Sequence, residues 1–440
     1  MTYFHNQDLS LLLKLLNFIE LKLLNLINLR YISNEMKPLF ILLFSCQVIF
    51  AQKKATPPTV YFPPKGSWET KSPSFFGIDE NKLNEAIQFA VKHETSMPKN
   101  QELAQLYNFY KEPYSDAMGP FTDRKSTSGI IVYKGYIIGS WGDVNFAEQT
   151  NSVTKSFVST AVGLAFDKGL IKSIEDKVGD YVPMIEPYDP NPFRAGEQIG
   201  QPQFIRLFDS EHNRKITWDH MLRQTSDWEG TLWGKPDWAD RPNDKPLEWI
   251  NRKHNEPGTV YKYNDTRVNA LALAATAVWH KSLPEVLREK IMEPIGASNQ
   301  WHWTGYRNSW IVMDGKLIQS VSGGGHFGGG MFISAMDMAR FGWLTYNKGR
   351  WNDQQLISEK WIALSTTPTQ ANPGYGFMNF FLNTGKKEFP SAPESAYAHI
   401  GNGTNMIYVD RENELVIVAR WIENKQLNEL ISKFLSALKK

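Results

Sequence analysis

The stretch Asn151-Ser-Val-Thr-Lys-Ser-Phe157 decides how the rest of this sequence is interpreted. It places Ser152 and Lys155 at the start of a run, extending to Leu170, whose apolar residues recur with helical spacing. Residues three apart on a helix share one face, about 5–6 Å apart at their Cβ atoms. A partly desolvated lysine amine can activate a neighbouring hydroxyl, and a helix N-terminus offers N–H groups to a developing oxyanion. The stretch therefore predicts a serine nucleophile.

The spacing Ser-x-x-Lys is common by chance, and it also occurs at Ser96–Lys99 and Ser436–Lys439. The first of these contains Pro98 and lies in a polar segment, and the second ends at the C-terminus, where chains fray. Only Ser152 opens a long apolar helix that can keep its lysine away from bulk water. The alternative interpretation is a helix-capping serine beside a lysine that reaches for solvent.

Composition narrows the classes of protein. Of the 440 residues, 42% are hydrophobic and 21% are charged, as in ordinary globular proteins. The 48 basic and 46 acidic residues give a net charge of +2, which argues against a nucleic-acid partner. The single cysteine, Cys46, excludes an intrachain disulfide, a four-cysteine zinc site and an iron–sulfur cluster. The nine histidines show no metal-hydrolase spacing, so we expect no metal and no cofactor.

The N-terminal segment, residues 1–51, predicts targeting. Residues 1–35 form a Leu/Asn-rich run interrupted by charges, unlike a spanning helix. From Met36, one lysine and an apolar stretch lead to Ala51, a pattern typical of a secretory signal peptide cleaved there. We expect synthesis to start at Met36 and the protein to be exported, most simply to a bacterial periplasm. The alternatives are an uncleaved anchor helix and lipid attachment at Cys46, because the residues before it loosely resemble a lipobox.

The mature chain alternates between sheet-like and helical patterns. Hairpin and strand signals occur over 129–141 and between 374 and 421, and helical spacing dominates the middle. These patterns predict an α+β protein whose sheet domain is interrupted by a mostly helical domain. We expect an exposed lead-in over 52–75, a sheet domain from 76–180 and 321–440, and a helical insert over 181–320.

Three later segments complete a family pattern. They are His220-Met-Leu-Arg-Gln-Thr-Ser226, Pro257-Gly-Thr-Val-Tyr-Lys-Tyr-Asn-Asp265 and His399-Ile-Gly401. Together with residues 151–157, and in this order, they resemble the serine β-lactamase/penicillin-binding family. The likeness is to the branch of class C β-lactamases, D,D-peptidases, esterases and aminohexanoate-dimer hydrolases, and it covers roughly 75–430. It implies a β-lactamase/transpeptidase-like fold, an antiparallel sheet flanked by helices with an inserted helical domain.

The resemblance also implies roles for single residues. Ser152 is the implied nucleophile, which forms an acyl-enzyme on a carbonyl substrate. Lys155 is its proton acceptor or electrostatic activator, and Tyr263 shares the acid/base work; which of the two is the base stays open. Tyr261, two positions earlier, points to the same face of an extended segment, but the family spacing favours Tyr263.

Two positions depart from the family pattern. Asp265 stands where the family has an amide, and an ionised carboxylate cannot donate to a substrate carbonyl. His399 stands where the family has the lysine of Lys-Thr-Gly, and a histidine is largely neutral at pH 7. The resemblance assigns the backbone N–H groups of Ser152 and Asn402 to an oxyanion hole beside Gly401. Both departures favour a short ester or a linear amide, such as an aminohexanoate oligomer, over a β-lactam.

Several alternatives remain open. The chain could be a D,D-peptidase or β-lactamase acting on cell-wall peptides or β-lactams, a slow-turnover penicillin-binding sensor, or a scaffold that has lost its chemistry. Nothing indicates the oligomeric state. The glycine-rich run 323–330 lacks the ending of a phosphate loop, so we expect close backbone packing there. Among the tryptophans of the insert, we expect Trp228 and Trp233 to line an aromatic substrate cleft.

Overall fold

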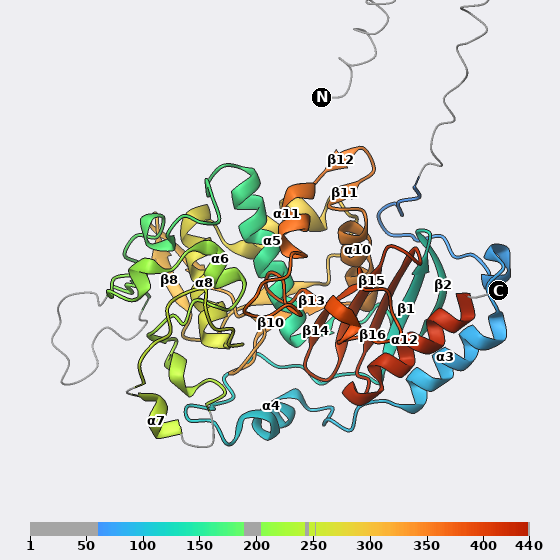
Figure 1. Ribbon diagram of the computed structural model, residues 1–440, viewed down its shortest axis with the longest axis horizontal. Helices are drawn as coiled ribbons and strands as arrows, with labels where there is room; N and C mark the ends of the chain where they lie inside the picture. The colour runs from blue at the N-terminus through green and yellow to red at the C-terminus, as the bar shows by residue number, and fades with distance from the viewer. Residues whose placement is uncertain (1–59, 189–203, 243–245, 251, 439–440) are drawn as a thin grey trace, which may run out of the picture. The chain divides into compact units, whose positions relative to one another are not determined.

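The computed structural model describes residues 60–188, 204–242, 246–250 and 252–438 (Figure 1). The predicted signal peptide, the expected start at Met36 and Cys46 lie outside these ranges. Within them, every helix is too short or too polar to cross a bilayer.

An antiparallel sheet of six strands forms one half of the molecule (Figure 1). Its order is β13-β14-β15-β16-β1-β2. The strands are β1 (Ser128–Tyr133), β2 (Tyr136–Trp141), β13 (Phe381–Leu382), β14 (Tyr397–Gly401), β15 (Asn405–Asp410) and β16 (Leu415–Arg420). Strand β1 pairs along its length with β16, from Ser128 opposite Arg420 to Tyr133 opposite Leu415. The early hairpin and the late strands therefore join in one sheet, and the predicted α+β fold class is confirmed.

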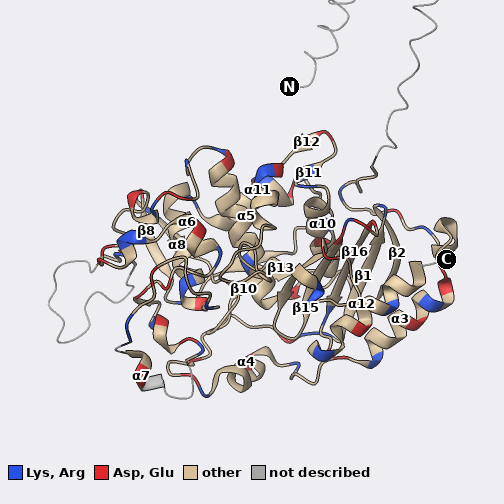
Figure 2. Cartoon of the chain, in the orientation of Figure 1, with Lys and Arg blue, Asp and Glu red and all other residues tan. Residues whose placement is uncertain are grey.

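The alternation of side chains along β1 explains why helices cover both faces of this sheet. Ile130 and Val132 belong to a core that includes residues of α5 (Thr154–Asp167) and α10 (Ala335–Tyr346). Ile131 points the other way, into a core built with α3 (Glu80–Lys92) and α12 (Leu427–Leu438). Figure 1 shows α3 and α12 together on that face. Figure 2 shows their charged residues, which alternate in sign along the two helices.

The segment predicted as a helical insert contains helices and short strands. Its described α-helices are α6 (Trp218–Leu222), α7 (Pro246–Ile250), α8 (Asp265–Trp279) and α9 (Leu283–Leu287). Strand β7 (His302–Thr304) pairs with β10 (Gly330–Ile333), which also pairs with β3 (Glu148–Gln149) just before Ser152. Residues of the insert and of the sheet also share one hydrophobic core. The insert thus continues the core of the sheet domain instead of forming a second one.

Most residues in the described part of the lead-in, 60–75, are exposed, and a few of its side chains anchor it to the sheet domain. Phe62 and Trp68 pack against the core, and the Trp68 indole donates to the carbonyl of Gly135 at 2.7 Å. Thr70 forms a parallel bridge with Ile137 at the edge of the sheet. Aromatic residues among the prolines provide this anchoring, because they give the polar stretch some apolar surface to bury.

Arg340 of α10 fastens this lead-in. Its buried guanidinium donates to the carbonyls of Pro63 at 3.1 Å, Pro64 at 2.9 Å and Ser67 at 2.9 Å. It also donates to the carbonyl of Ile295 at 2.8 Å. One side chain therefore ties residues 63–67 to α10 and to Ile295 of the insert.

We expect Arg340→Met to lower the free energy of unfolding by about 2–3 kcal/mol, because it leaves buried carbonyls without a donor. Urea denaturation measures this loss, and limited proteolysis should cut first within residues 60–70. Arg350→Met, at an exposed position of β11 (Arg350–Trp351), is the control and should change neither result. Equal stability of the two variants would contradict the assigned role.

Candidate active site

Ser152 lies at the entrance to a buried helix. It sits in the single 3₁₀ turn Asn151–Val153, which leads directly into α5. Every residue of α5 from Thr154 to Ala165 is buried, which agrees with the dense apolar pattern of the sequence. Lys155 lies on this buried part and its side chain is 0% exposed. The local sequence thus places a hydroxyl at the pocket and a lysine in the dry interior behind it.

The ammonium group of Lys155 has three acceptors around it. Its Nζ lies 2.7 Å from Ser152 Oγ, 2.8 Å from Asp265 Oδ1 and 3.2 Å from the carbonyl oxygen of Gly323. An ammonium has three hydrogens and no acceptor site. The contacts to Ser152 and Gly323 are hydrogen bonds and the contact to Asp265 is an ion pair, so the geometry fits an ammonium that donates to Ser152.

Asp265 is the buried counter-ion of the site. It is the first residue of α8, its side chain is 1% exposed, and its Oδ2 pairs with Arg241 Nη1 at 2.8 Å. Burial alone would raise the pKa of Asp265, but Arg241 and Lys155 outweigh burial and hold that pKa well below its usual range. Asp265 is therefore ionised, and it faces Lys155 and Arg241, not the pocket.

Gln224, in the segment that begins at His220, holds the loop that carries Tyr263. The backbone carbonyl of Gln224 accepts from the N–H of Lys262 at 2.9 Å, and its side-chain oxygen accepts from the N–H of Asn264 at 2.7 Å. These two bonds flank Tyr263 on both sides. Asn264 then caps α8 by accepting from the N–H of Arg267.

Tyr263, and not Tyr261, reaches the nucleophile. The side chains of Tyr263 and Ser152 are hydrogen-bonded, and the centroid of the Tyr263 ring lies 5.0 Å from Lys155 Nζ. Burial raises the pKa of Tyr263 well above its ordinary value, and Asp265 adds to the rise while Arg241 opposes it. Tyr263 is thus a neutral phenol at pH 7. Tyr261 packs instead against Tyr375, at 5.1 Å between ring centroids.

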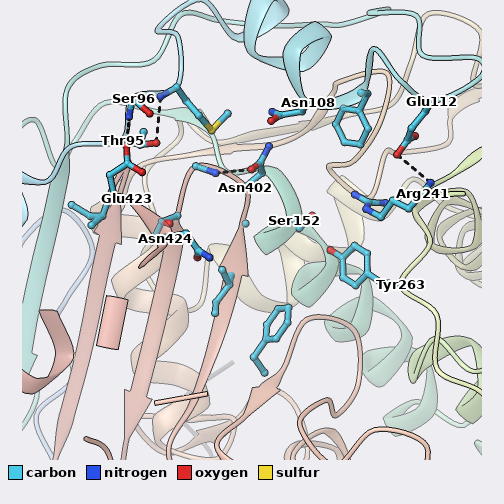
Figure 3. Close-up of a pocket in the computed structure, with 18 residues that line it drawn as sticks. Thr95, Ser96, Asn108, Glu112, Ser152, Arg241, Tyr263, Asn402, Glu423 and Asn424 are labelled. Carbon is cyan, nitrogen blue, oxygen red and sulfur yellow. Dashed lines mark hydrogen bonds between the residues drawn. The ribbon is translucent and has the colours of Figure 1, made fainter. Parts of the chain in front are cut away.

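A pocket of about 620 Å³ opens at this constellation (Figure 3). Ser152, Tyr263 and Arg241 line one part of it, and Gly401 and Asn402 line another. Gly401 leaves no room for a side chain, because a Cβ there would lie 2.3 Å from the carbonyl oxygen of Thr150 and 3.0 Å from the Ser152 nitrogen. The structure thus brings the end of β14 against the backbone of the nucleophile, where the oxyanion hole is expected.

The glycine-rich run packs on the active-site helices, as its sequence predicts. A Cβ at Gly324 would lie 2.1 Å from the carbonyl oxygen of Asn151, and one at Gly325 would lie 2.1 Å from the carboxyl carbon of Asp265. A side chain fits at neither position, because Gly324 lies against the backbone of Asn151 and Gly325 lies against the carboxyl group of Asp265. The same packing places the carbonyl oxygen of Gly323 3.2 Å from Lys155 Nζ.

A model of the beta-lactamase family matches residues 149–422, more than half of the chain. The chain belongs to the beta-lactamase family. It is a serine hydrolase with the β-lactamase/transpeptidase-like fold. A search of curated proteins returns no match.

This family member is also similar to solved structures at low identity. A beta-lactamase from Mycobacterium bovis is 15% identical, with a TM-score of 0.46, 71% of this chain covered and 95% of the other. A penicillin-binding protein homologue from Pyrococcus abyssi is 17% identical, with a TM-score of 0.46 and coverages of 71% and 72%. EstCE1, a hydrolase with promiscuous acyltransferase activity, is 13% identical, with a TM-score of 0.48 and coverages of 81% and 98%.

His399 does not face the pocket of this beta-lactamase family member. Its side chain is 0% exposed, and Nδ1 lies 2.8 Å from the hydroxyl oxygen of Ser156 on α5. The aromatic rings of Phe341 and Phe380 pack against the imidazole. Burial lowers its pKa to about 3, so His399 is neutral at pH 7. Because β14 alternates, Ile400 reaches the pocket and His399 points into the core.

Trp228 and Trp233 are also core residues, which corrects the expectation of an aromatic cleft around them. They are 2% and 7% exposed, and the Trp228 indole donates to the carbonyl of Leu207 at 2.7 Å. Aromatic residues do line the pocket, but they are Phe109, Tyr263 and Phe381. Phe109 and Phe381 come from segments with no recognisable motif.

Arg241 and Asp240 were not found by sequence reasoning. The Asp240 carboxylate is fully buried, binds Arg241 Nη1 at 3.0 Å and accepts from the backbone N–H of Asp265 at 2.5 Å. Asp240, Asp265 and His326 are close enough to share a metal ion. However, Arg241 contacts both carboxylates and Lys155 contacts one, so their charge is already balanced.

We expect the buried His399 to make stability depend on pH. In the unfolded chain a histidine binds a proton below about 6.5, whereas folded His399 stays neutral down to about 3. The unfolded state therefore binds more protons in this window. The free energy of unfolding decreases as the pH is lowered from about 6.5 toward 3, by up to about 1.4 kcal/mol per pH unit.

His399→Gln should make this slope smaller in urea denaturations between pH 4 and 7, while His326, whose pKa is also lowered by burial, keeps part of it. His302→Gln, at an exposed site, is the matched control and should keep the slope of the original protein. Identical slopes for the original protein and His399→Gln would refute the buried neutral state.

Proposed function

We propose that this protein is an exported hydrolase that cleaves a short ester or a linear amide through an acyl-enzyme on Ser152. The observation that carries the proposal is the set of three acceptors around Lys155. Lys155 donates to Ser152 Oγ, so the single hydrogen of the hydroxyl is free to point to Tyr263, its other hydrogen-bond partner. Export rests on the sequence of residues 36–51 alone.

The proposed reaction begins with Ser152 Oγ attacking the substrate carbonyl. Its proton passes to Tyr263 Oη, and the phenol's own proton passes to the leaving oxygen or nitrogen. The ammonium of Lys155 stabilises the negative charge that builds up on Oγ, and the backbone N–H groups of Ser152 and Asn402 stabilise the oxyanion. Water then attacks the acyl-enzyme by the reverse proton path, which releases the acid and restores Ser152.

The state of β14 supports an ester or linear amide over a β-lactam. At the position of the family's lysine, His399 is buried and neutral, so the β14 strand offers no side-chain cation to a substrate carboxylate. Turnover of short esters and linear amides, set against penicillins, distinguishes this proposal from the lactamase and peptidase alternatives. A slow sensor would remain acylated.

We expect a fluorophosphonate probe to add one adduct to the intact protein and none to Ser152→Ala, because only an activated hydroxyl attacks phosphorus quickly. Intact-mass spectrometry measures the adduct, and thermal melts show that both proteins are folded. Ser96→Ala is the matched control, since Ser96 lines the same pocket and also precedes a lysine by three residues. An adduct on Ser152→Ala, or none on the unmodified chain, would refute the proposal.

We expect Asp265→Asn to lower kcat/KM for a short ester by about 10²-fold, because Lys155 loses its buried counter-ion. Stability should fall by about 3 kcal/mol or more, as when a buried ion pair is broken. Asp240→Asn is the matched control, since Asp240 also binds Arg241 and has no contact with Lys155. A kcat/KM loss that is no larger for Asp265→Asn than for Asp240→Asn would contradict this role of Asp265.

A further inference from the structure

Two charged side chains of the buried network, Arg241 and Glu112, reach the pocket. The carboxylates of Asp240 and Asp265 are 0% and 1% exposed, and Lys155 and Lys235 are both 0% exposed. Arg241, by contrast, is 36% exposed and lines the pocket beside Tyr263 (Figure 3). The charges of the network nearly cancel, but the pocket wall presents the guanidinium of Arg241 and hides the carboxylates of Asp240 and Asp265 behind it.

The backbone of Arg241 is fixed at both ends. Its N–H donates to Glu112 Oε1 at 3.1 Å, and its carbonyl accepts from Lys262 Nζ at 2.8 Å. Its φ of +48° is in the left-handed region, which is unfavourable for a residue with a long side chain. Nothing in the local sequence requires this conformation, so the surrounding contacts hold the residue in place.

The guanidinium is held with one edge free. Nη1 binds the carboxylates of Asp240 and Asp265, while Nη2 has no acceptor among the described residues. The group stacks over Tyr263, 5.0 Å from its ring centroid, and lies 5.5 Å from that of Phe109. A planar guanidinium with a free edge is suited to binding a carboxylate, and the flanking aromatic rings fit a short hydrocarbon spacer.

We propose that Arg241 binds a carboxylate on the leaving group of the substrate. This inference rests on the proposed function, in which Tyr263, stacked under Arg241, protonates the leaving group. The substrate is then an ester or amide whose leaving group is a hydroxy acid or an amino acid, with its carboxylate against Arg241. The site replaces the cation that β14 lacks, and it does so from the opposite wall of the pocket.

The two acidic residues of the pocket determine which end of the substrate can carry a carboxylate. Glu112 lies near Arg241, but its oxygens are occupied by Lys235 Nζ at 2.7 Å and by the N–H of Arg241. Glu423 lies at the other end, where it accepts from the N–H of Ser96 at 2.6 Å (Figure 3). No described cation lies within ion-pair distance of Glu423. A negative charge on the acyl side of the substrate would meet Glu423, so a carboxylate is favoured only on the leaving-group side.

The test uses acetyl esters of ω-hydroxyalkanoic acids with two to six carbons as substrates, and compares each with the matching primary carboxamide. The two members of a pair have the same shape and differ in charge. For the best chain length, we expect kcat/KM of the carboxylate to exceed that of the carboxamide by about 10-fold or more. In Arg241→Gln this ratio should fall to about one, and Arg241→Lys should keep part of it. Arg214→Gln, at an exposed position, is the control and should have the same ratio as the original protein.

A ratio that is the same in the original protein and in Arg241→Gln, or no preference at any length, overturns the inference. If Arg241→Gln does not fold, the salt dependence of the original protein tests the inference instead. Its preference for the carboxylate should weaken between about 0.02 and 0.5 M NaCl, and its kcat/KM for the carboxamide should stay unchanged. An acyl-side carboxylate, tested as a succinate half-ester, should gain nothing. Fluorophosphonate labelling of Ser152 separates the two proposals: labelling without a charge preference rejects Arg241 alone, and absence of labelling rejects the hydrolase.

Discussion

The buried ion pair between Lys155 and Asp265 is the interaction on which the site depends. Two opposite charges are removed from water at 0% and 1% exposure, a cost that is offset only by close contact and further hydrogen bonds. Both conditions are met, because Ser152, Gly323 and Arg241 supply the remaining partners. The pair also joins the helix of the sheet domain to the first residue of the longest helix of the insert. The catalytic geometry is therefore coupled to the packing of the two parts.

This pair changes how the lysine can act. In the proposed mechanism, Lys155 donates to Ser152 and Asp265 is its counter-ion at 2.8 Å. The proposed mechanism gives the phenol of Tyr263 the task of carrying protons between the nucleophile and the leaving group. Because Asp265 stands where the family has an amide, we propose that this one departure from the family pattern assigns proton transfer to the tyrosine and electrostatic stabilisation to the lysine.

The charge pattern of the pocket follows from the same network. On β14, the position that resembles the family's cation is turned into the core, where an imidazole is packed between aromatic rings and kept neutral. Arg241 is placed on the opposite wall, with its carboxylate partners behind it. The pocket therefore has a positive group, Arg241, beside Tyr263 and a carboxylate, Glu423, at its other end. An asymmetric charge of this kind favours one orientation of a charged substrate.

The sequence by itself determined the fold class, the hairpin and late strands, the buried helix behind Ser152 and the close packing of the glycine-rich run. It could do so because strand alternation, helical spacing and the steric needs of glycine are local properties. The order and spacing of four segments also selected Ser152, Lys155 and Tyr263 as the residues to bring together. Only the tertiary structure decided that Asp265 faces Lys155, that His399 and Trp228 are buried, and that Arg241 lines the pocket. These outcomes depend on which face of a strand or loop meets a distant element, and on charges that are far apart in the chain, so no local pattern encodes them.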